Sequence, residues 1–166
     1  MILRSLSLVG GLALGAGTSQ FPEFSQQYAQ RLGGAVSALS QVVADFDASA
    51  SAEGLSRAAA LEQMRGTAFI ERRRTDMERT FSRYETLSAD LHTLEGQGPF
   101  MRAFHAARMT DTEVAGAAWE AFEPAVPLNF AGLVFACSGF LAGAFATGGV
   151  LALLRAPFRM RRRRHA

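Results

Sequence analysis

The most restrictive feature of the sequence is a run of 30 residues, from Ala125 to Leu154, without a single charged side chain. Its apolar part, Phe130 to Leu154, has 25 residues. As an α-helix this part would measure about 37 Å, because each residue adds about 1.5 Å. A helix needs about 20 apolar residues to cross a bilayer core. We therefore predict a transmembrane helix over residues 128–154. The alternative is a buried helix of a soluble core, but such helices rarely lack a polar face over this length.

A second uncharged stretch runs from Ser5 to Pro22, directly after Arg4. One positive residue followed by a short apolar run and small residues is typical of a secretory signal peptide, which cleavage would remove. The same stretch, apolar from Leu6 to Ala16, also suits an uncleaved transmembrane helix over residues 2–20. Both interpretations stay open here, and we favour the retained helix because of its glycine spacing.

Both uncharged segments contain a pair of glycines four residues apart. Gly11 and Gly15 form the pattern G-x-x-x-G in the first segment, and Gly139 and Gly143 form it in the second. Small residues at this spacing create a flat strip on a helix, so that two backbones can approach closely in lipid. We expect these glycines to be helix-packing residues, either within one chain or between two copies. A cleaved signal peptide would have no use for such a strip.

Charge is strongly segregated along the chain, although the formal net charge is only +2. All 15 acidic residues lie between Glu23 and Glu123 together with ten arginines, which gives this stretch a net charge of −5. The two ends hold the other seven arginines. Because basic residues accumulate on the cytoplasmic side of membrane helices, we expect both termini in the cytoplasm. Residues 21–124 would then be periplasmic, with the chain in a bacterial inner membrane.

Residues 155–166 form an arginine-rich tail directly after the second segment. The tail contains no acidic residue, and arginines at this position attract anionic lipid headgroups at about 1 kcal/mol each. We expect a contact with anionic lipid through Arg155, Arg159, Arg161, Arg162, Arg163 and Arg164. The alternative is a stop-transfer and topology signal without a lipid partner.

The central segment is expected to be helical. Between Phe24 and Phe46, apolar residues recur at steps of three and four, which is the spacing of one helix face. This helix should end in the small-residue stretch 47–54. The expected elements that follow are a helix from the N-cap Ser56 to Glu95, a stop at 96–99, and short helices over 100–108 and 113–122. No stretch alternates as a β-strand does. The predicted fold is therefore all-α, with two transmembrane helices flanking a helical hairpin.

Residues that carry chemistry are sparse. The spacing of His92 and Glu95 does not by itself define a metal site. The acids beside the run 72–74 of three arginines predict a self-paired, solvated helix face rather than a nucleic-acid contact. Neither apolar core contains the charged residue that marks an ion or proton pathway. We therefore expect no catalytic residue, cofactor, metal or nucleic-acid partner, and predict that the protein is not an enzyme.

Two motifs resemble those of a known family. The runs Ser19–Gly34 and Phe122–Pro127 resemble the signature of a family of small proteobacterial inner-membrane proteins, catalogued as a domain of unknown function. The resemblance covers nearly the whole chain. It implies a layout with two membrane spans, and it implies no activity, cofactor or functional residue.

Both motifs adjoin a predicted membrane boundary and contain aromatic residues and proline. Because aromatic side chains favour the membrane interface, we expect the two junctions to pack together as an interface collar. Its expected members are Phe21, Pro22, Phe24, Tyr28, Trp119, Phe122, Pro124 and Pro127.

These features predict a non-enzymatic inner-membrane protein with a periplasmic helical interaction domain. It would be an accessory, assembly or scaffolding component of an envelope complex, and its partner would be another protein or a second copy. The alternative is a periplasmic sensor domain that binds a ligand or lipid, because chemoreceptor input domains share the order of span, helices and span. Only 12 residues follow Leu154, so such a sensor would act through a partner.

Overall fold

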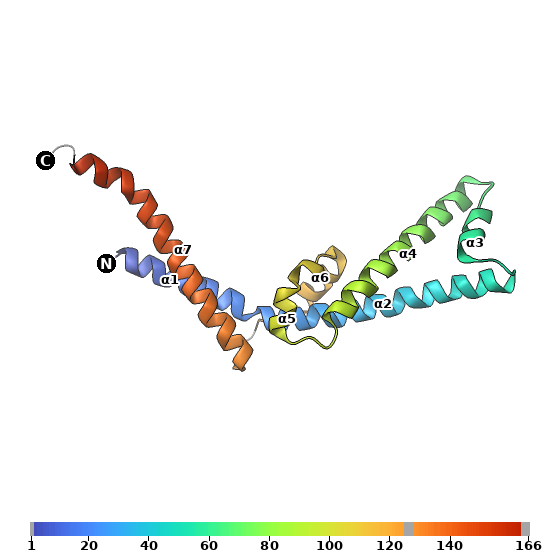
Figure 1. Ribbon diagram of the computed structural model, residues 1–166, viewed down its shortest axis with the longest axis horizontal. Coiled ribbons are helices and arrows are strands. Elements are labelled where there is room, and N and C mark those ends of the chain that lie inside the picture. Colours follow the sequence, from blue (N-terminus) through green and yellow to red (C-terminus); the bar gives the residue numbers. More distant parts are fainter. Residues whose placement is uncertain (1, 125–127, 164–166) are drawn as a thin grey trace. The chain divides into compact units, whose positions relative to one another are not determined.

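The computed structural model describes residues 2–124 and 128–163, with side chains from Arg4 to Leu154. All regular structure in these residues is helical, which confirms the all-α prediction (Figure 1). The chain divides into two compact units. The terminal unit comprises Met1–Ser25 and Phe122–Ala166, and the central unit comprises Gln26–Ala121.

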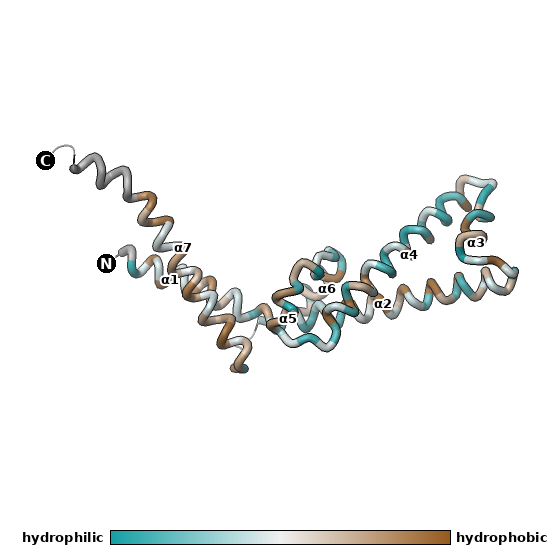
Figure 2. Tube along the Cα trace, in the orientation of Figure 1, coloured by the Kyte–Doolittle hydropathy of each residue, from teal (hydrophilic) through white to brown (hydrophobic). Residues whose placement is uncertain are grey.

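The terminal unit contains a pair of antiparallel helices, α1 (Ile2–Ser19) and α7 (Phe130–Arg163). Both chain ends leave the pair at the same end (Figure 1). Within the described residues, Phe130–Leu154 of α7 is the segment that is long and apolar enough to cross a membrane. Figure 2 shows how hydrophobic this part of α7 is. The predicted membrane-length helix is therefore present, whereas the second span, over residues 2–20, stays a prediction.

The central unit is built on two long helices, α2 (Phe21–Ala52) and α4 (Ala68–Leu94), with the first residues of α2 belonging to the terminal unit. They contact each other through Phe46 and Phe81, whose ring centroids lie 5.1 Å apart. The shorter elements are α3 (Arg57–Gln63), α5 (Pro99–Phe104), the 3-10 helix η1 (Ala106–Arg108) and α6 (Thr112–Glu120). In Figure 1, α3 lies at one end of the hairpin, while α5 and α6 lie at the other.

The end of α2 differs from the sequence-based boundary. The helix continues through the small-residue stretch to Ala52, because alanine has the highest helix propensity of all residues. Serine is tolerated there because its hydroxyl can bond back to the helix, as Ser49 does to the carbonyl of Asp45 at 2.9 Å. The turn comes at Gly54, which has a φ of +65°.

The expected single helix from Ser56 to Glu95 is two helices. Ser56 caps α3 as predicted, since its hydroxyl accepts the N–H of Ala59 at 3.2 Å. Gly66 then takes a φ of +107°, which interrupts the helix. Thr67 caps the restarted helix α4.

The last short helix, α6, begins one residue earlier than expected. Asp111 is its N-cap, and the carboxylate accepts the N–H of Val114 at 2.9 Å. The helix ends at Glu120 rather than Phe122.

The core of the central unit lies where the helical periodicity predicted it. Between Phe24 and Phe46, the apolar residues at the predicted face of α2 are buried or half-buried. One of them, Phe46, packs edge to face against Phe81 of α4. The buried apolar residues of this unit are Tyr28, Leu32, Val43, Ala50, Phe81, Leu87, Leu94, Val114 and Ala118.

Candidate functional site: the glycine contact and its surroundings

The glycine pairs lie at the contact between α1 and α7. All four glycines, Gly11, Gly15, Gly139 and Gly143, are buried in this contact. A methyl group added at Gly15 would lie 2.8 Å from the carbonyl oxygen of Ala136, and one added at Gly139 would lie 2.9 Å from that of Leu14. Such distances are shorter than real side chains allow. The helices therefore approach so closely only because these positions lack a side chain.

A hydrogen bond between the helices lies at one end of the glycine contact. The hydroxyl of Thr18 on α1 donates to the carbonyl oxygen of Phe135 on α7 at 2.7 Å. Carbonyls of its own helix lie farther from this hydroxyl, at 3.0 and 3.3 Å. A hydroxyl in or near an apolar helix is expected to bond a backbone carbonyl, and the structure adds that the nearest carbonyl to Thr18 belongs to α7.

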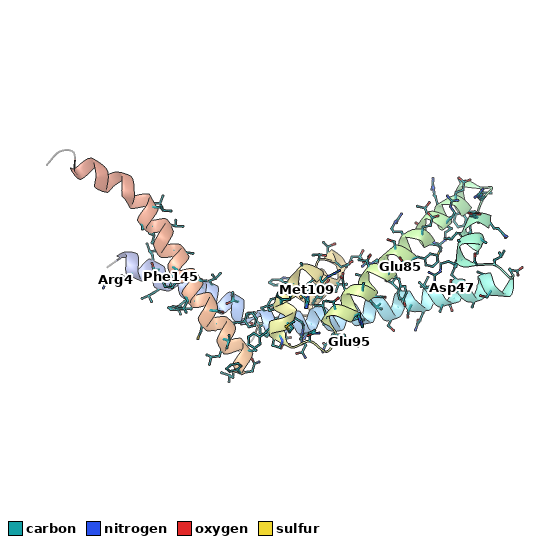
Figure 3. The ribbon with its side chains drawn as sticks, viewed as in Figure 1. Arg4, Asp47, Glu85, Glu95, Met109 and Phe145 are labelled. Carbon is teal, nitrogen blue, oxygen red and sulfur yellow. The ribbon has the colours of Figure 1, made fainter. Side chains whose placement is uncertain are left out.

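The outer surface of the helix pair is strongly apolar. Large apolar side chains project away from the contact, and Phe145, labelled in Figure 3, is 77% exposed. Soluble monomers rarely expose contiguous apolar patches of more than a few hundred Å². The other exposed members are Leu6, Leu8, Val9, Leu12, Leu14, Phe130, Leu133, Val134, Leu141, Val150, Leu153 and Leu154.

Small residues also leave an apolar hollow beside the contact. It has a volume of about 530 Å³, and Gly15, Ala136 and Cys137 line it. Apart from the thiol of Cys137 the lining is apolar, so the hollow has the character of a space for an acyl chain or an apolar side chain.

Two pairs of aromatic rings lie within the terminal unit, and each includes at least one residue expected in the collar. The rings of Phe21 and Phe135 have centroids 5.4 Å apart, and the rings of Phe24 and Phe122 meet edge to face at 6.1 Å. Such aromatic pairs contribute about 0.5–1.5 kcal/mol beyond the area that they bury. Pro22 lies in the first turn of α2, and its carbonyl oxygen accepts a hydrogen bond from the hydroxyl of Ser25.

Two further residues expected in the collar, Tyr28 and Trp119, belong to the central unit. Tyr28 is fully buried in the central unit, where its hydroxyl accepts the backbone N–H of Asp111 at 3.3 Å. Burial raises the pKa of Tyr28. Trp119 belongs to α6 and is 68% exposed. Pro124 lies after α6 in an exposed segment, and Pro127 lies outside the described residues.

The arginine tail prolongs α7. Backbone helix extends to Arg163, because arginine is a good helix former. The side chains of Arg155, Arg159, Arg161, Arg162 and Arg163, and all of Arg164, lie outside the described part of the structure. The expected lipid contact therefore stays a prediction.

A polar network that sequence reasoning missed joins the short elements to α4. Asp90 is 7% exposed, and its carboxylate pairs with Arg108 of η1 at 3.3 Å. Arg83 pairs with Asp111 at 3.2 Å and with Glu113 at 2.7 Å. Asp90 lies among leucines at helical spacing, which was a usable signal that its carboxylate shares the buried face.

A second ionic contact closes the end of the hairpin near α3. Arg57 donates two hydrogen bonds to the carboxylate of Asp47, at 2.8 and 2.6 Å, and lies over the ring of Phe81. The hydrogen bond from Arg57 lowers the pKa of Asp47, and the same bond raises the pKa of Arg57. These charges satisfy one another, so the contact is structural. No cluster of metal-ligating side chains occurs among the described residues.

The fold and the glycine contact define an all-α protein with a close pair of apolar helices. The chain belongs to the family described as "Protein of unknown function (DUF2937)", whose model matches residues 2–160. The family resemblance of the two motifs is thereby confirmed, in the form of a domain of unknown function. No curated protein and no solved structure matches the chain significantly.

Proposed function

We propose that this protein is a non-enzymatic inner-membrane protein. In this proposal α1 and α7 cross the bilayer as a hairpin and present the central unit in the periplasm as an interaction module. The observation that carries the proposal is the glycine contact, which brings two apolar helices together and leaves an apolar outer surface. Lipid is the solvent in which such a surface is favourable.

The contact supports a retained first helix rather than a cleaved one. It extends along most of α1, since Ser7 approaches Gly148 near one end and Thr18 bonds Phe135 near the other. The 18 residues of α1 measure about 27 Å, close to the roughly 30 Å of a bilayer core. Removing α1 would expose the glycine strip of α7 to lipid without a partner.

The proposed orientation rests on charge. Seven arginines lie at the two chain ends, whereas the part between them has a net charge of −5. With both ends on one side of an antiparallel helix pair, the positive-inside rule favours cytoplasmic termini.

The proposed interaction role rests on the length and surface of the central helices. The 32 residues of α2 measure about 48 Å. Much of this length is exposed and available to a partner. We therefore propose an accessory, assembly or scaffolding component, whose partner is another envelope protein or a second copy.

Cysteine labelling tests the membrane arrangement. In a Cys137→Ala background, the exposed position of Gln41→Cys should react with a membrane-impermeant maleimide in cells whose outer membrane has been made permeable. His165→Cys should react only after the inner membrane is broken. The opposite pattern would reverse the proposed orientation, and an intact mass that lacks the first residues would remove α1 from the membrane hairpin.

Purification in a mild detergent tests the interaction role. A stoichiometric protein partner or a stable homo-oligomer supports the proposal. A monomer with a bound small molecule or lipid would contradict it and favour the sensor alternative.

A further inference from the structure

The outer face of α4 repeats the same kinds of residue every seven positions. One edge of this charged face is acidic, the other edge is basic, and a seam of small side chains runs between them. The acidic edge is Glu71, Glu78 and Glu85, the basic edge is Arg72 and Arg79, and the seam is Ala68, Thr75, Ser82 and Ala89. A spacing of seven residues keeps each set in line along a helix. All nine side chains are exposed, so the part of the chain that the structure describes leaves this face open.

Within one copy, the charges of this face are only loosely paired. Glu78 and Arg79 pair with neighbours on their own helix, at 3.5 and 3.7 Å. Glu71 and Arg72 take part in no ion pair among the described residues. They cannot pair with each other, because adjacent residues of a helix do not face each other. Exposed pairs of this kind contribute little, so these charges are available to a partner.

The small side chains of the seam leave space between the two charged edges. A hollow of about 510 Å³ lies along the first half of the face. Its lining consists of Ala68, Glu71, Arg72, Thr75, Asp76 and Arg79. A second helix can therefore approach this face closely and bring its own charged side chains beside these edges.

The opposite charges of the two edges select how a second copy of α4 can lie on this face. When two identical helices face each other in parallel, the acidic edge of each lies opposite the basic edge of the other. When they face each other antiparallel, acidic edges meet and basic edges meet. Charges that flank a helix seam set the orientation of the pair, and like charges in contact disfavour it. The charged face is therefore complementary to itself in the parallel arrangement.

We propose that α4 pairs in parallel with α4 of a second copy, about a two-fold axis that runs along the seam. In this pair Glu71 lies opposite Arg72 of the second copy. Glu78 lies opposite Arg79 of the second copy, and the two-fold axis repeats both contacts. The inference rests on the proposed interaction role and deepens it, because it names the surface and the partner.

A shared membrane favours this pair. The seam from Ala68 to Ala89 is about 32 Å long, and a single strip of this kind is smaller than a standard protein interface. The pair is therefore weak between free molecules, whereas two copies in one membrane meet at a high effective concentration. The glycine strips already contact each other within one chain, so a second copy needs another surface.

Disulfide formation in native membranes tests the pair, in a Cys137→Ala background. Thr75→Cys and Ser82→Cys, each introduced alone, should crosslink two copies, because a parallel pair brings each seam position within about 7 Å of its own counterpart. Arg73→Cys is the control. This exposed position lies two residues from Thr75, about 200° around the helix, and should not crosslink. Failure of either seam position to crosslink overturns the inference, and so does equal crosslinking at position 73.

A charge exchange tests which side chains hold the pair. In the Ser82→Cys variant, Arg72→Glu should lower the crosslinking rate by about tenfold, because two symmetric contacts become repulsive. Adding Glu71→Arg restores opposite charges between the copies and should restore the rate. Arg73→Glu makes the same change one residue away and should leave the rate unchanged. No loss with Arg72→Glu, a loss without rescue, or an equal loss with Arg73→Glu contradicts the inference. Circular dichroism of each variant establishes that the helices are retained.

Co-purification separates this inference from the proposed function. A stable complex with a different protein, in a chain whose seam does not crosslink, contradicts only the α4 pair, because an interaction role remains. A chain with neither a protein partner nor a seam crosslink contradicts both proposals.

Discussion

Replacing one buried glycine by leucine should separate α1 from α7, whereas the same change two residues away should not. Gly15 faces α7, and a Cβ at this position would lie 2.8 Å from the carbonyl oxygen of Ala136 and 3.2 Å from the Cβ of Phe140. Gly17 lies on the same helix with no atom within 4 Å of such a Cβ. Gly15→Leu and Gly17→Leu therefore change helix propensity and hydropathy by the same amount. They differ in that only the leucine at position 15 would collide with α7.

The magnitude follows from how little the neighbouring atoms can yield. The closest neighbour of a Gly15 side chain is backbone, so the helices must move apart. Leucine extends two further carbon–carbon bonds, about 2.5 Å, beyond its Cβ. Overpacking of this kind costs about 1–3 kcal/mol. Since 1.4 kcal/mol is a factor of ten, the equilibrium between the packed and separated pair should shift by about 5- to 150-fold.

Disulfide formation between the two helices measures this shift. Ser7 and Gly148 approach within 3.3 Å when a Cβ is added at Gly148, so Ser7→Cys with Gly148→Cys should crosslink in a Cys137→Ala background. Gly15→Leu should strongly reduce the yield and rate of crosslinking, because a disulfide cannot bridge Cα atoms more than about 7 Å apart. Gly17→Leu should leave them unchanged. Equal crosslinking in both variants would refute the close glycine contact.

Three further predictions concern single polar groups. Thr18→Val removes the hydrogen bond to α7 and should weaken the helix pair by about 0.6 kcal/mol, as measured in the same crosslinking assay. The control is Ser138→Ala, which should leave the helix pair unchanged because the hydroxyl of Ser138 bonds a carbonyl of its own helix. Tyr28→Phe removes the acceptor at the start of α6 and should lower the free energy of unfolding by about 1 kcal/mol, as measured by urea titration of the purified chain. The pKa of Asp47 is lower in the folded chain than in the unfolded chain. Its carboxylate therefore stabilises the fold fully at a pH above the unfolded-state pKa, and this contribution is lost as the pH falls through the folded-state pKa. Asp47→Asn should therefore flatten the decline of the thermal unfolding temperature in acid, and Asp45→Asn, at an exposed carboxylate nearby, should leave that decline as it is.

The sequence predicted the helical face of α2 well and the division of the second long helix poorly. Steps of three and four residues between Phe24 and Phe46 report directly on which side of a helix can be buried. The break at Gly66 depends on a positive φ. Glycine permits this φ but does not demand it, because glycine also occurs inside helices at a cost of about 1 kcal/mol.

The candidate site was predictable in kind but not in detail. The spacing of Gly11 and Gly15 indicates a packing strip on α1, and the spacing of Gly139 and Gly143 indicates one on α7. Neither spacing indicates that Thr18 would bond across the pair. A hydrogen bond of this kind depends on the register between two helices that are more than 100 residues apart in the chain.

The contacts of the interface collar were also not predictable from local sequence. Aromatic residues near a membrane boundary share a preference for the interface, and this preference does not distinguish Phe24 from Tyr28. In the structure, Phe24 meets Phe122, whereas Tyr28 is buried in the central unit against the cap of α6. One helical turn of α2 separates the two environments.

The sequence by itself determined the helical fold class, the membrane-length segment Phe130–Leu154 and the segregation of charge along the chain. These are properties of single segments, because hydropathy, periodicity and net charge add up along the chain. Only the tertiary structure decided that Gly15 lies against α7 and that Asp90 pairs with Arg108. Contacts of this kind depend on the register between distant segments, which is set by the combined shape of both surfaces and by no local pattern in either.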